Sequence, residues 1–220
     1  MLLQVPGHRV GADPALTTIE ANPPPFAPGM RIGLFGGSFN PVHEGHRLVA
    51  RQCLRRLQLD ALWMLVSPGN PLKDHGELAP LETRMAGVRG LIDDPRVRVT
   101  GFEAARGFRY TFETVDFLTR SCEGARFVWI MGADSLRDFH RWERWEDIAD
   151  VVPMAIYARP GSNFRATRSP AAIRLAPFRI PEEAAETLAD RGPPAWVYLR
   201  GIMSAQSSTA LRARARIDAN

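Results

Sequence analysis

The segment with the clearest capacity for chemistry is residues 33–46, GLFGGSFNPVHEGH, which combines two adjacent glycines with two histidines. Gly36 and Gly37 allow the backbone to approach a phosphate closely or to adopt a positive φ angle. His43 and His46 are three residues apart, so at the start of a helix their side chains can point to the same side. Such a turn could bind a polyphosphate and stabilise the charge on a departing anion.

Three other interpretations of this turn need weighing. It matches neither the dinucleotide motif G-x-G-x-x-G nor the phosphate loop G-x-x-x-x-G-K-[ST], because no lysine follows. A zinc site from His43, Glu44 and His46 lacks the spacing of H-E-x-x-H, in which the histidines are four apart. The third alternative is a tight turn with two surface histidines. We favour anion chemistry, because glycines and histidines converge where parallel sheets present ligands.

The elements that must position this turn have the pattern of a strand, a helix and a second strand. Residues 31–35 form a short apolar run that ends in the two glycines, and residues 61–68 resemble a buried strand. Between them, residues 43–57 place apolar side chains on one stripe and arginines opposite. This β-turn-α-β pattern predicts the start of a parallel sheet.

The alternation of strands and helices continues to about residue 160. Helical patterns cover 81–92, 110–122 and 134–150, the last as one or two helices, and strand patterns cover 97–103, 126–132 and 151–161. We predict an α/β fold, a Rossmann-like doubly wound parallel sheet with flanking helices. Further along we expect a helix at 181–192, a strand at 194–201 and a small C-terminal helical portion at 207–217.

Composition narrows the class of protein. The chain has 220 residues, 45% of them hydrophobic, which argues against general disorder. Cys53 and Cys122 are too few for a disulfide framework and indicate a reducing compartment. No apolar run reaches the roughly 18 residues of a membrane-spanning helix, and the N-terminus lacks the pattern of a secretory signal, so we expect a cytoplasmic protein.

Charge leaves several partners open. The 28 basic residues exceed the 24 acidic ones by four, and all the basic residues except Lys73 are arginines. This surplus is compatible with nucleic acid, phosphorylated metabolites or acidic surfaces. The surplus lies within residues 161–220, whereas residues 30–160 are nearly balanced.

A family resemblance makes the glycine turn more specific. Residues 36–46, GGSFNPVHEGH, resemble the signature of the HxGH nucleotidyltransferases, which transfer an adenylyl or cytidylyl group from a nucleoside triphosphate and release pyrophosphate. Four further segments resemble bacterial nicotinate mononucleotide adenylyltransferases, in the same order and with matching spacing over residues 30–212. They are SPGNPLK at 67–73, FRYTFETVDFL at 108–118, IMGADSLRDFHRWERWEDI at 130–148 with YARPG at 157–161, and SSTALR at 207–212.

The resemblance implies a reaction and its partners. ATP and nicotinate mononucleotide would give deamido-NAD and pyrophosphate in NAD biosynthesis, assisted by Mg²⁺ that is bound through the ATP phosphates rather than by side chains. We therefore expect no nucleic-acid or membrane partner. Residues 30–220 would form a single nucleotidyltransferase domain, and the proline-rich residues 1–29 a disordered extension.

The resemblance also assigns residues to the two substrates. His43 and His46 would be the catalytic pair. The expected ATP-binding set is Gly36, Gly37, Ser38, Phe39, His43, His46, Gly132, Asp134, Ser207, Ser208, Thr209 and Arg212. The expected set for the mononucleotide is Asn70, Lys73, Tyr110, Thr111, Trp142 and Arg159.

Several of these residues have a purely structural alternative. Asp134 directly precedes a helical pattern, where aspartate is favoured as an N-cap. Trp142 has helical spacing with Trp145 and Ile148, which fits core packing equally well. Lys73 could simply be exposed, and residues 207–217 could be a capped basic surface helix.

The sequence departs from the family pattern at two places. Asn40 stands where many relatives carry Asp, and Glu143 stands where an aromatic residue is frequent. Two alternative functions stay open. One is another HxGH adenylyltransferase, for example one acting on phosphopantetheine. The other is a non-catalytic module that binds a nucleotide or nucleic acid, as the RARAR run at 212–216 would allow.

Overall fold

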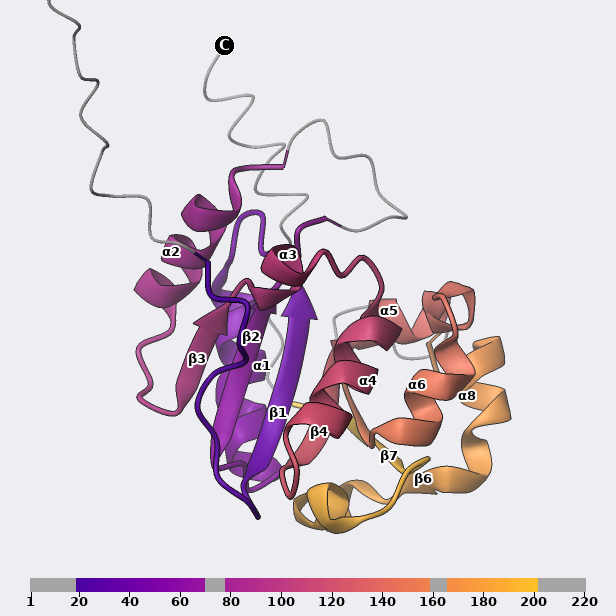
Figure 1. The fold of residues 1–220 in the computed structure, drawn as a ribbon. Helices are drawn as coiled ribbons and strands as arrows, with labels where there is room; N and C mark the ends of the chain where they lie inside the picture. The colour runs from indigo at the N-terminus through magenta and orange to yellow at the C-terminus, as the bar shows by residue number, and fades with distance from the viewer. Residues whose placement is uncertain (1–18, 70–77, 159–165, 202–220) are drawn as a thin grey trace, which may run out of the picture.

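A central parallel sheet organises the chain. The computed structural model describes residues 19–69, 78–158 and 166–201. Within these residues seven strands form one sheet in the order β3-β2-β1-β4-β5-β7-β6, and all neighbouring pairs are parallel (Figure 1). The strands are β1 (Arg31–Gly37), β2 (Ala61–Val66), β3 (Val97–Thr100), β4 (Arg126–Gly132), β5 (Met154–Tyr157), β6 (Arg179–Ile180) and β7 (Trp196–Leu199).

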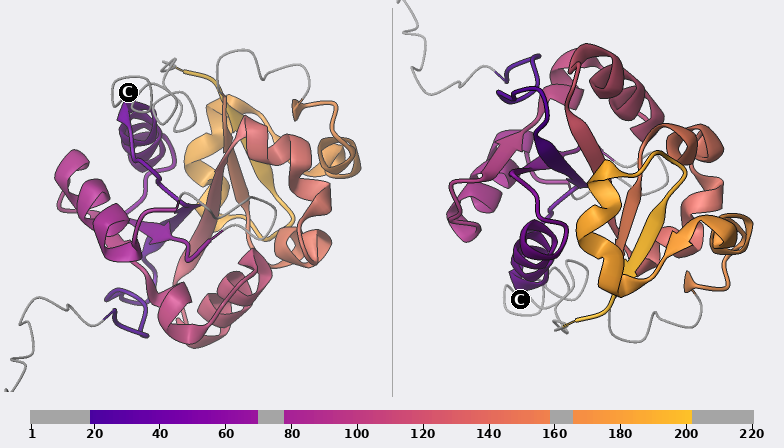
Figure 2. Two further views of the ribbon diagram at one scale, coloured as in Figure 1. Left: turned by 90° about the horizontal axis from the view of Figure 1, so that it is seen from above. Right: turned by 90° about the horizontal axis from the view of Figure 1, so that it is seen from below.

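Helices cover both faces of the sheet, as Figure 2 shows from above and below. One face packs against α1 (Glu44–Arg56), α2 (Leu81–Leu91) and the 3₁₀ segment η3 (Glu182–Asp190). The other face packs against α3 (Phe102–Arg106), α4 (Thr111–Ser121), α5 (Ala133–Asp138), α6 (Trp145–Val151) and α8 (Pro170–Arg174). Two short 3₁₀ turns follow helices of this face: η1 (Phe139–Arg141) follows α5, and η2 (Ala176–Phe178) follows α8. The predicted doubly wound α/β fold is confirmed.

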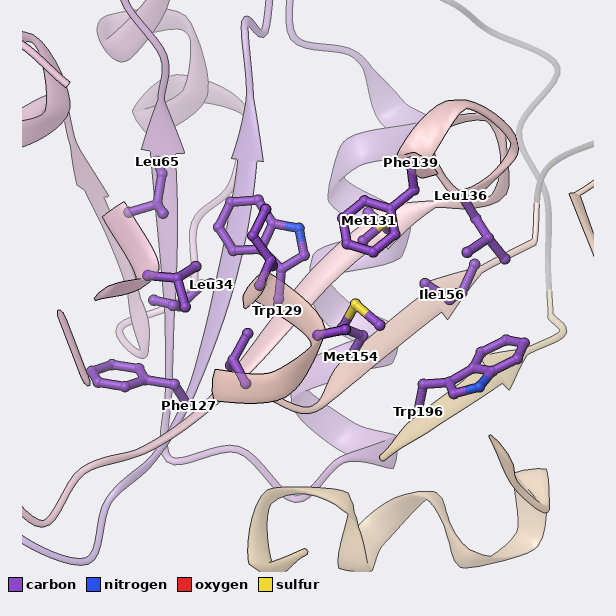
Figure 3. Packing of buried hydrophobic residues seen from close by; sticks show 14 of the residues in the cluster. Leu34, Leu65, Phe127, Trp129, Met131, Leu136, Phe139, Met154, Ile156 and Trp196 are labelled. Atoms are coloured by element: carbon purple, nitrogen blue, oxygen red, sulfur yellow. The ribbon is translucent and has the colours of Figure 1, made fainter. Parts of the chain in front are cut away.

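Two hydrophobic layers follow from the strand periodicity of two. On β4, Trp129 and Met131 face one layer, whereas Val128 and Ile130 face the other. Figure 3 shows part of the first layer, in which Met131 and Ile156 from the neighbouring strands β4 and β5 lie beside Phe139 and Leu136. Both layers are almost fully buried, so the sheet is held rigidly from both sides.

Some predicted elements differ in extent or type. The strand expected at 97–103 ends at Thr100, whose Oγ1 accepts a hydrogen bond from the Phe102 N–H at 3.2 Å and so starts α3. The pattern at 134–150 forms α5, η1 and α6, and Arg144, which has a left-handed φ of 51°, stands between η1 and α6. The helix expected at 181–192 is the 3₁₀ segment η3. The helix α8 was not predicted, and residues 207–217 lie outside the described part.

Part of the expected N-terminal extension packs against the domain. The Gly29 N–H donates to the Gly124 carbonyl at 2.8 Å, and Arg106 Nε donates to the Ala21 carbonyl at 2.6 Å. Phe26 is partly buried against the first hydrophobic layer. The expectation of disorder is therefore wrong for residues 19–29, whose prolines favour an extended segment that the core holds in place. Residues 1–18 are outside the described part.

Candidate active site

The candidate site lies at the carboxyl edge of the sheet, where the strand order reverses. The neighbouring strands β1 and β4 end at Gly37 and Gly132. After β1 the chain enters α1 on one face, and after β4 it enters α5 on the other face. Open parallel sheets bind ligands at such a switch point, so the glycine turn stands at the expected place.

Neighbouring side chains leave little room for a Cβ atom at either glycine of the turn. A Cβ atom at Gly36 would lie 2.7 Å from Cη2 of Trp129, and one at Gly37 would lie 3.0 Å from the ring of Phe39. Neither glycine has a positive φ; in the turn that angle occurs at Phe39, at 46°. The expectation that these glycines could supply positive φ is therefore wrong, whereas the close approach of the backbone that they allow remains.

Phe39 anchors the turn despite its left-handed backbone. Its side chain is buried and makes edge-on ring contacts with Phe35 and His46, at centroid distances of 5.6 and 5.0 Å. A non-glycine residue in this conformation costs about 1 kcal/mol or more, which the ring contacts offset. The Asn40–Pro41 peptide bond that follows is cis.

His43 and His46 form a buried pair at the N-terminus of α1. Their rings lie 3.9 Å apart between centroids, and the residues are only 4% and 8% exposed. His43 Nδ1 accepts a hydrogen bond from the Gly45 N–H at 3.1 Å, and His46 Nδ1 accepts one from the His43 N–H at 3.2 Å. The alternative of two surface histidines is therefore wrong.

These two hydrogen bonds define which ring nitrogen can donate. An imidazole nitrogen that accepts a hydrogen bond carries no proton, so the neutral ring holds its proton on Nε2. Both histidines thus have Nε2–H groups as donors, beside a helix N-terminus whose backbone dipole favours anions. This arrangement can donate hydrogen bonds to phosphate oxygens.

Gly132 and Asp134 begin the helix that follows β4. Gly132 is the N-cap of α5, with an extended backbone, and Asp134 is exposed in the first turn of that helix. The structural alternative that Asp134 is the N-cap is therefore wrong. An exposed carboxylate in this position can accept hydrogen bonds from hydroxyl groups.

Two segments expected at the mononucleotide lie side by side on the second face. Tyr110 is the N-cap of α4 and is 42% exposed, and Thr111 is the first residue of that helix. Glu113 Oε2 accepts hydrogen bonds from the Arg109 and Tyr110 N–H groups at 2.7 and 2.9 Å, which fixes the backbone there.

Trp142 belongs to the second of these segments, between η1 and α6. Its ring makes an edge-on contact with Phe139 at 5.3 Å and is half-buried, so part of the indole packs in the core and part is accessible. The Arg144 guanidinium lies 3.6 Å from the ring centroid of Phe112 and thereby joins this segment to the start of α4.

The remaining expected site residues lie outside the described part of the chain. They are Asn70, Lys73, Arg159, Ser207, Ser208, Thr209 and Arg212.

Sequence reasoning missed two buried ionisable residues, the first of which contacts the glycine turn. Arg84 on α2 donates hydrogen bonds to three backbone carbonyls, one of which is that of Ser38. Its spacing from Leu81 and Val88 places it on the buried stripe of the helix, a signal that could have revealed it.

The second missed residue is Glu103 on α3. It accepts a hydrogen bond from Thr114 Oγ1 at 2.6 Å, and burial raises the pKa of its carboxyl group. This contact closes the turn that carries Tyr110. No pattern in the sequence separates Glu103 from an exposed glutamate.

The described residues contain neither a metal cluster nor a membrane-spanning helix. Among them, no group of three or more His, Cys, Asp and Glu side chains is placed to hold a metal ion. Within the same residues, no helix combines the length and apolar character that a membrane crossing needs.

A family model and several curated relatives match most of the chain. A family model described as Cytidylyltransferase-like matches residues 34–214. A curated relative from Methylorubrum extorquens, named "Probable nicotinate-nucleotide adenylyltransferase", is 57% identical over 185 residues, which cover 84% of this chain and all of the relative. A relative of the same name from a Bradyrhizobium species is 54% identical over 83% of this chain and 95% of its own length.

Solved structures agree on the fold. Nicotinic acid mononucleotide adenylyltransferase from Plasmodium falciparum has been solved in complex with APC and in complex with NaAD. These structures match with TM-scores of 0.64 and 0.65, covering 84% of this chain and 83% of theirs. At 13% and 14% sequence identity, the likeness concerns the arrangement of helices and strands.

Proposed function

The chain belongs to the cytidylyltransferase-like family, and on that premise we propose that it transfers an adenylyl group from ATP to nicotinate mononucleotide. The products are deamido-NAD and pyrophosphate, and the reaction is a step of NAD biosynthesis. Support comes from relatives that are named for this reaction at 57% and 54% identity over nearly their whole length.

The chemistry is a displacement at the α-phosphorus of ATP. A phosphate oxygen of the mononucleotide forms the new bond to phosphorus, the bond to the bridging oxygen between the α and β phosphates breaks, and its electron pair leaves with pyrophosphate. The nucleophilic phosphate is already ionised near neutral pH, so no strong general base is needed. Catalysis then depends on in-line positioning and on neutralisation of charge in the transition state.

One arrangement supports this chemistry above all: the buried pair of His43 and His46 with both Nδ1 atoms bound to backbone N–H groups. Because those bonds fix the rings, the Nε2–H donors are oriented before ATP arrives. Donors held in advance toward developing negative charge lower the barrier without reorganisation. The backbone of residues 36–39 contributes further contacts to the phosphates.

We assign the other substrate contacts to residues that come after strand β4 and at the start of α4. Asp134 accepts hydrogen bonds from the ribose of ATP, beside Gly132. Trp142 offers an indole face to the pyridine ring. Tyr110 and Thr111, at the start of the helix that Arg144 joins to the Trp142 segment, contribute to the same substrate site. ATP takes part as its Mg²⁺ complex, in which the phosphate oxygens that this hard cation prefers hold the metal.

Three expectations extend this assignment. Asn70, Lys73 and Arg159 contribute to the mononucleotide site, and residues 207–212 contribute to the triphosphate site. The reaction takes place in the cytoplasm.

A substrate panel tests the proposal. Purified protein is given Mg-ATP with nicotinate mononucleotide, nicotinamide mononucleotide or phosphopantetheine in separate reactions, and pyrophosphate is measured in each. We expect release with nicotinate mononucleotide. Release with phosphopantetheine alone would identify a different adenylyltransferase, and salt-sensitive binding of DNA or RNA without any release would indicate a binding module.

A further inference from the structure

A buried cation lies directly behind the glycine turn. Arg84 is 4% exposed, in the first half of α2, and its described hydrogen-bond partners are carbonyl oxygens. Nη1 donates to the Ser38 and Ser67 carbonyls at 2.7 and 2.8 Å, and Nε donates to the Ala79 carbonyl at 2.8 Å. Burial lowers the pKa of the Arg84 guanidinium, which nevertheless stays charged because arginine titrates far above neutral pH.

The three carbonyls belong to three different segments. Ser38 is in the turn after β1, Ser67 follows β2, and Ala79 precedes α2. Two other hydrogen bonds join the same segments: the Ser67 N–H donates to the Gly37 carbonyl at 3.0 Å, and the Ala79 N–H donates to Asn40 Oδ1 at 3.3 Å. Arg84 thus donates hydrogen bonds to all three segments at the point where the glycine turn meets the ends of β2 and α2.

The bond to Ser38 sets the direction of a peptide group. The peptide bond between Ser38 and Phe39 is trans, so its carbonyl and its N–H point to opposite sides. Because the carbonyl points to Arg84, the Phe39 N–H points away from α2. Phe39 has a φ of 46°, a conformation that the surroundings must impose.

We propose that Arg84 is a positioning residue for the phosphate-binding turn. Its guanidinium fixes the Ser38–Phe39 peptide so that the Phe39 N–H is presented to the triphosphate, and it adds a fixed positive charge behind the turn. This role rests on the proposed function, in which the backbone of residues 36–39 contacts the ATP phosphates.

The test compares how tightly each substrate binds to variants at this position. Arg84→Met keeps most of the side-chain volume and removes the donors and the charge. Arg84→Lys keeps the charge but lacks the planar fork that holds two carbonyls at once, and it serves if the Met variant does not fold. Arg89→Met is the matched control, because Arg89 is an exposed arginine on the same helix.

Calorimetric titrations use α,β-methylene-ATP with Mg²⁺ and, separately, nicotinate mononucleotide. We expect Arg84→Met to weaken binding of the ATP analogue by about 10-fold or more, since it removes hydrogen bonds to a charged donor. Arg84→Lys should give a smaller loss. In both variants the mononucleotide should bind within about 3-fold of wild type, and Arg89→Met should match wild type for both ligands.

Two results would overturn the role of Arg84. One is binding of the ATP analogue within about 2-fold of wild type in a folded Arg84 variant. The other is an equal loss for both ligands, which would mean general destabilisation. Because titration needs no turnover, lack of pyrophosphate release by the wild-type protein would contradict the proposed function alone. Failure of the wild-type protein to bind the analogue would overturn both.

Discussion

The indole of Trp129 packs against Gly36 so closely that a Cβ atom on Gly36 would lie 2.7 Å from Cη2 of the indole. The two residues are on the neighbouring strands β1 and β4, so the indole packs directly against the backbone that leads into the glycine turn. The position of the turn is therefore coupled to the hydrophobic layer beneath the sheet edge.

Gly36→Ala should destabilise the protein, because the rigid indole must shift to admit a methyl group. We expect the free energy of unfolding to fall by about 1–3 kcal/mol, measured by urea denaturation. In a Trp129→Leu background the same change should cost less, because the smaller side chain leaves room.

Gly90→Ala is the matched control for this substitution. Gly90 is exposed on α2 with nothing within 4 Å of a built Cβ, so alanine there should be neutral or stabilising by up to about 1 kcal/mol. Equal effects at the two glycines would refute the coupling between Gly36 and Trp129.

His46→Asn should separate the contributions of the two ring nitrogens of His46. The Asn Oδ1 can replace Nδ1 as acceptor for the His43 N–H, but no donor remains where Nε2 was. We expect a folded protein whose turnover falls by about 100-fold or more, as for other losses of a transition-state donor. Near-normal turnover in a variant with wild-type thermal unfolding would remove His46 from catalysis.

Trp142→Ala and Trp145→Ala should have different consequences, although both rings contact Phe139. If Trp142 stacks on the pyridine ring, its loss should raise KM for nicotinate mononucleotide by about 10-fold. The KM for ATP should change by less than about 3-fold. Trp145→Ala should mainly lower stability. Steady-state kinetics with each substrate varied, together with unfolding curves, decide between stacking and core packing.

Glu103→Gln should change how stability depends on pH. Burial raises the pKa of this carboxyl in the folded protein above its ordinary value of 4.5, so the folded state binds more protons than the unfolded state above that pH. The contribution of Glu103 to the free energy of unfolding therefore has its full value below pH 4.5. It is lost as pH rises through the folded-state pKa. Glutamine does not titrate.

The measurement is the difference in unfolding free energy between the Glu103→Gln variant and wild type, from about pH 4 to pH 8. This difference should shift in favour of the variant as pH rises. A difference that is constant with pH, or that shifts the other way, would mean that burial does not destabilise the ionised form of Glu103.

The sequence was sufficient for those parts of the molecule that depend on local patterns. The apolar runs of β1, β2 and β4 and the striped helix α1 predicted the doubly wound sheet, and the spacing of His43 and His46 predicted their pairing. What could not be predicted depends on contacts between distant segments. The bonds of Arg84 to Ser38 and Ser67 and the burial of Glu103 arise only once the strands are assembled.

Predictions from the conformational preferences of single residues were also wrong where tertiary packing outweighs those preferences. The positive φ falls on Phe39, whose ring contacts Phe35 and His46, whereas Gly36 and Gly37 are the last residues of strand β1. Residues 22–29 contain four prolines, a composition that favours disorder, yet Phe26 packs on the core.

Adenylyl transfer to nicotinate mononucleotide is tested most directly by following the α-phosphorus of ATP. Purified protein is incubated with Mg²⁺, nicotinate mononucleotide and ATP labelled at the α-phosphate, and the products are separated by chromatography. We expect label in deamido-NAD, with pyrophosphate released in equal amount, and loss of both in the His46→Asn variant. Unlabelled mononucleotide and intact ATP after incubation with folded wild-type protein would contradict this expectation.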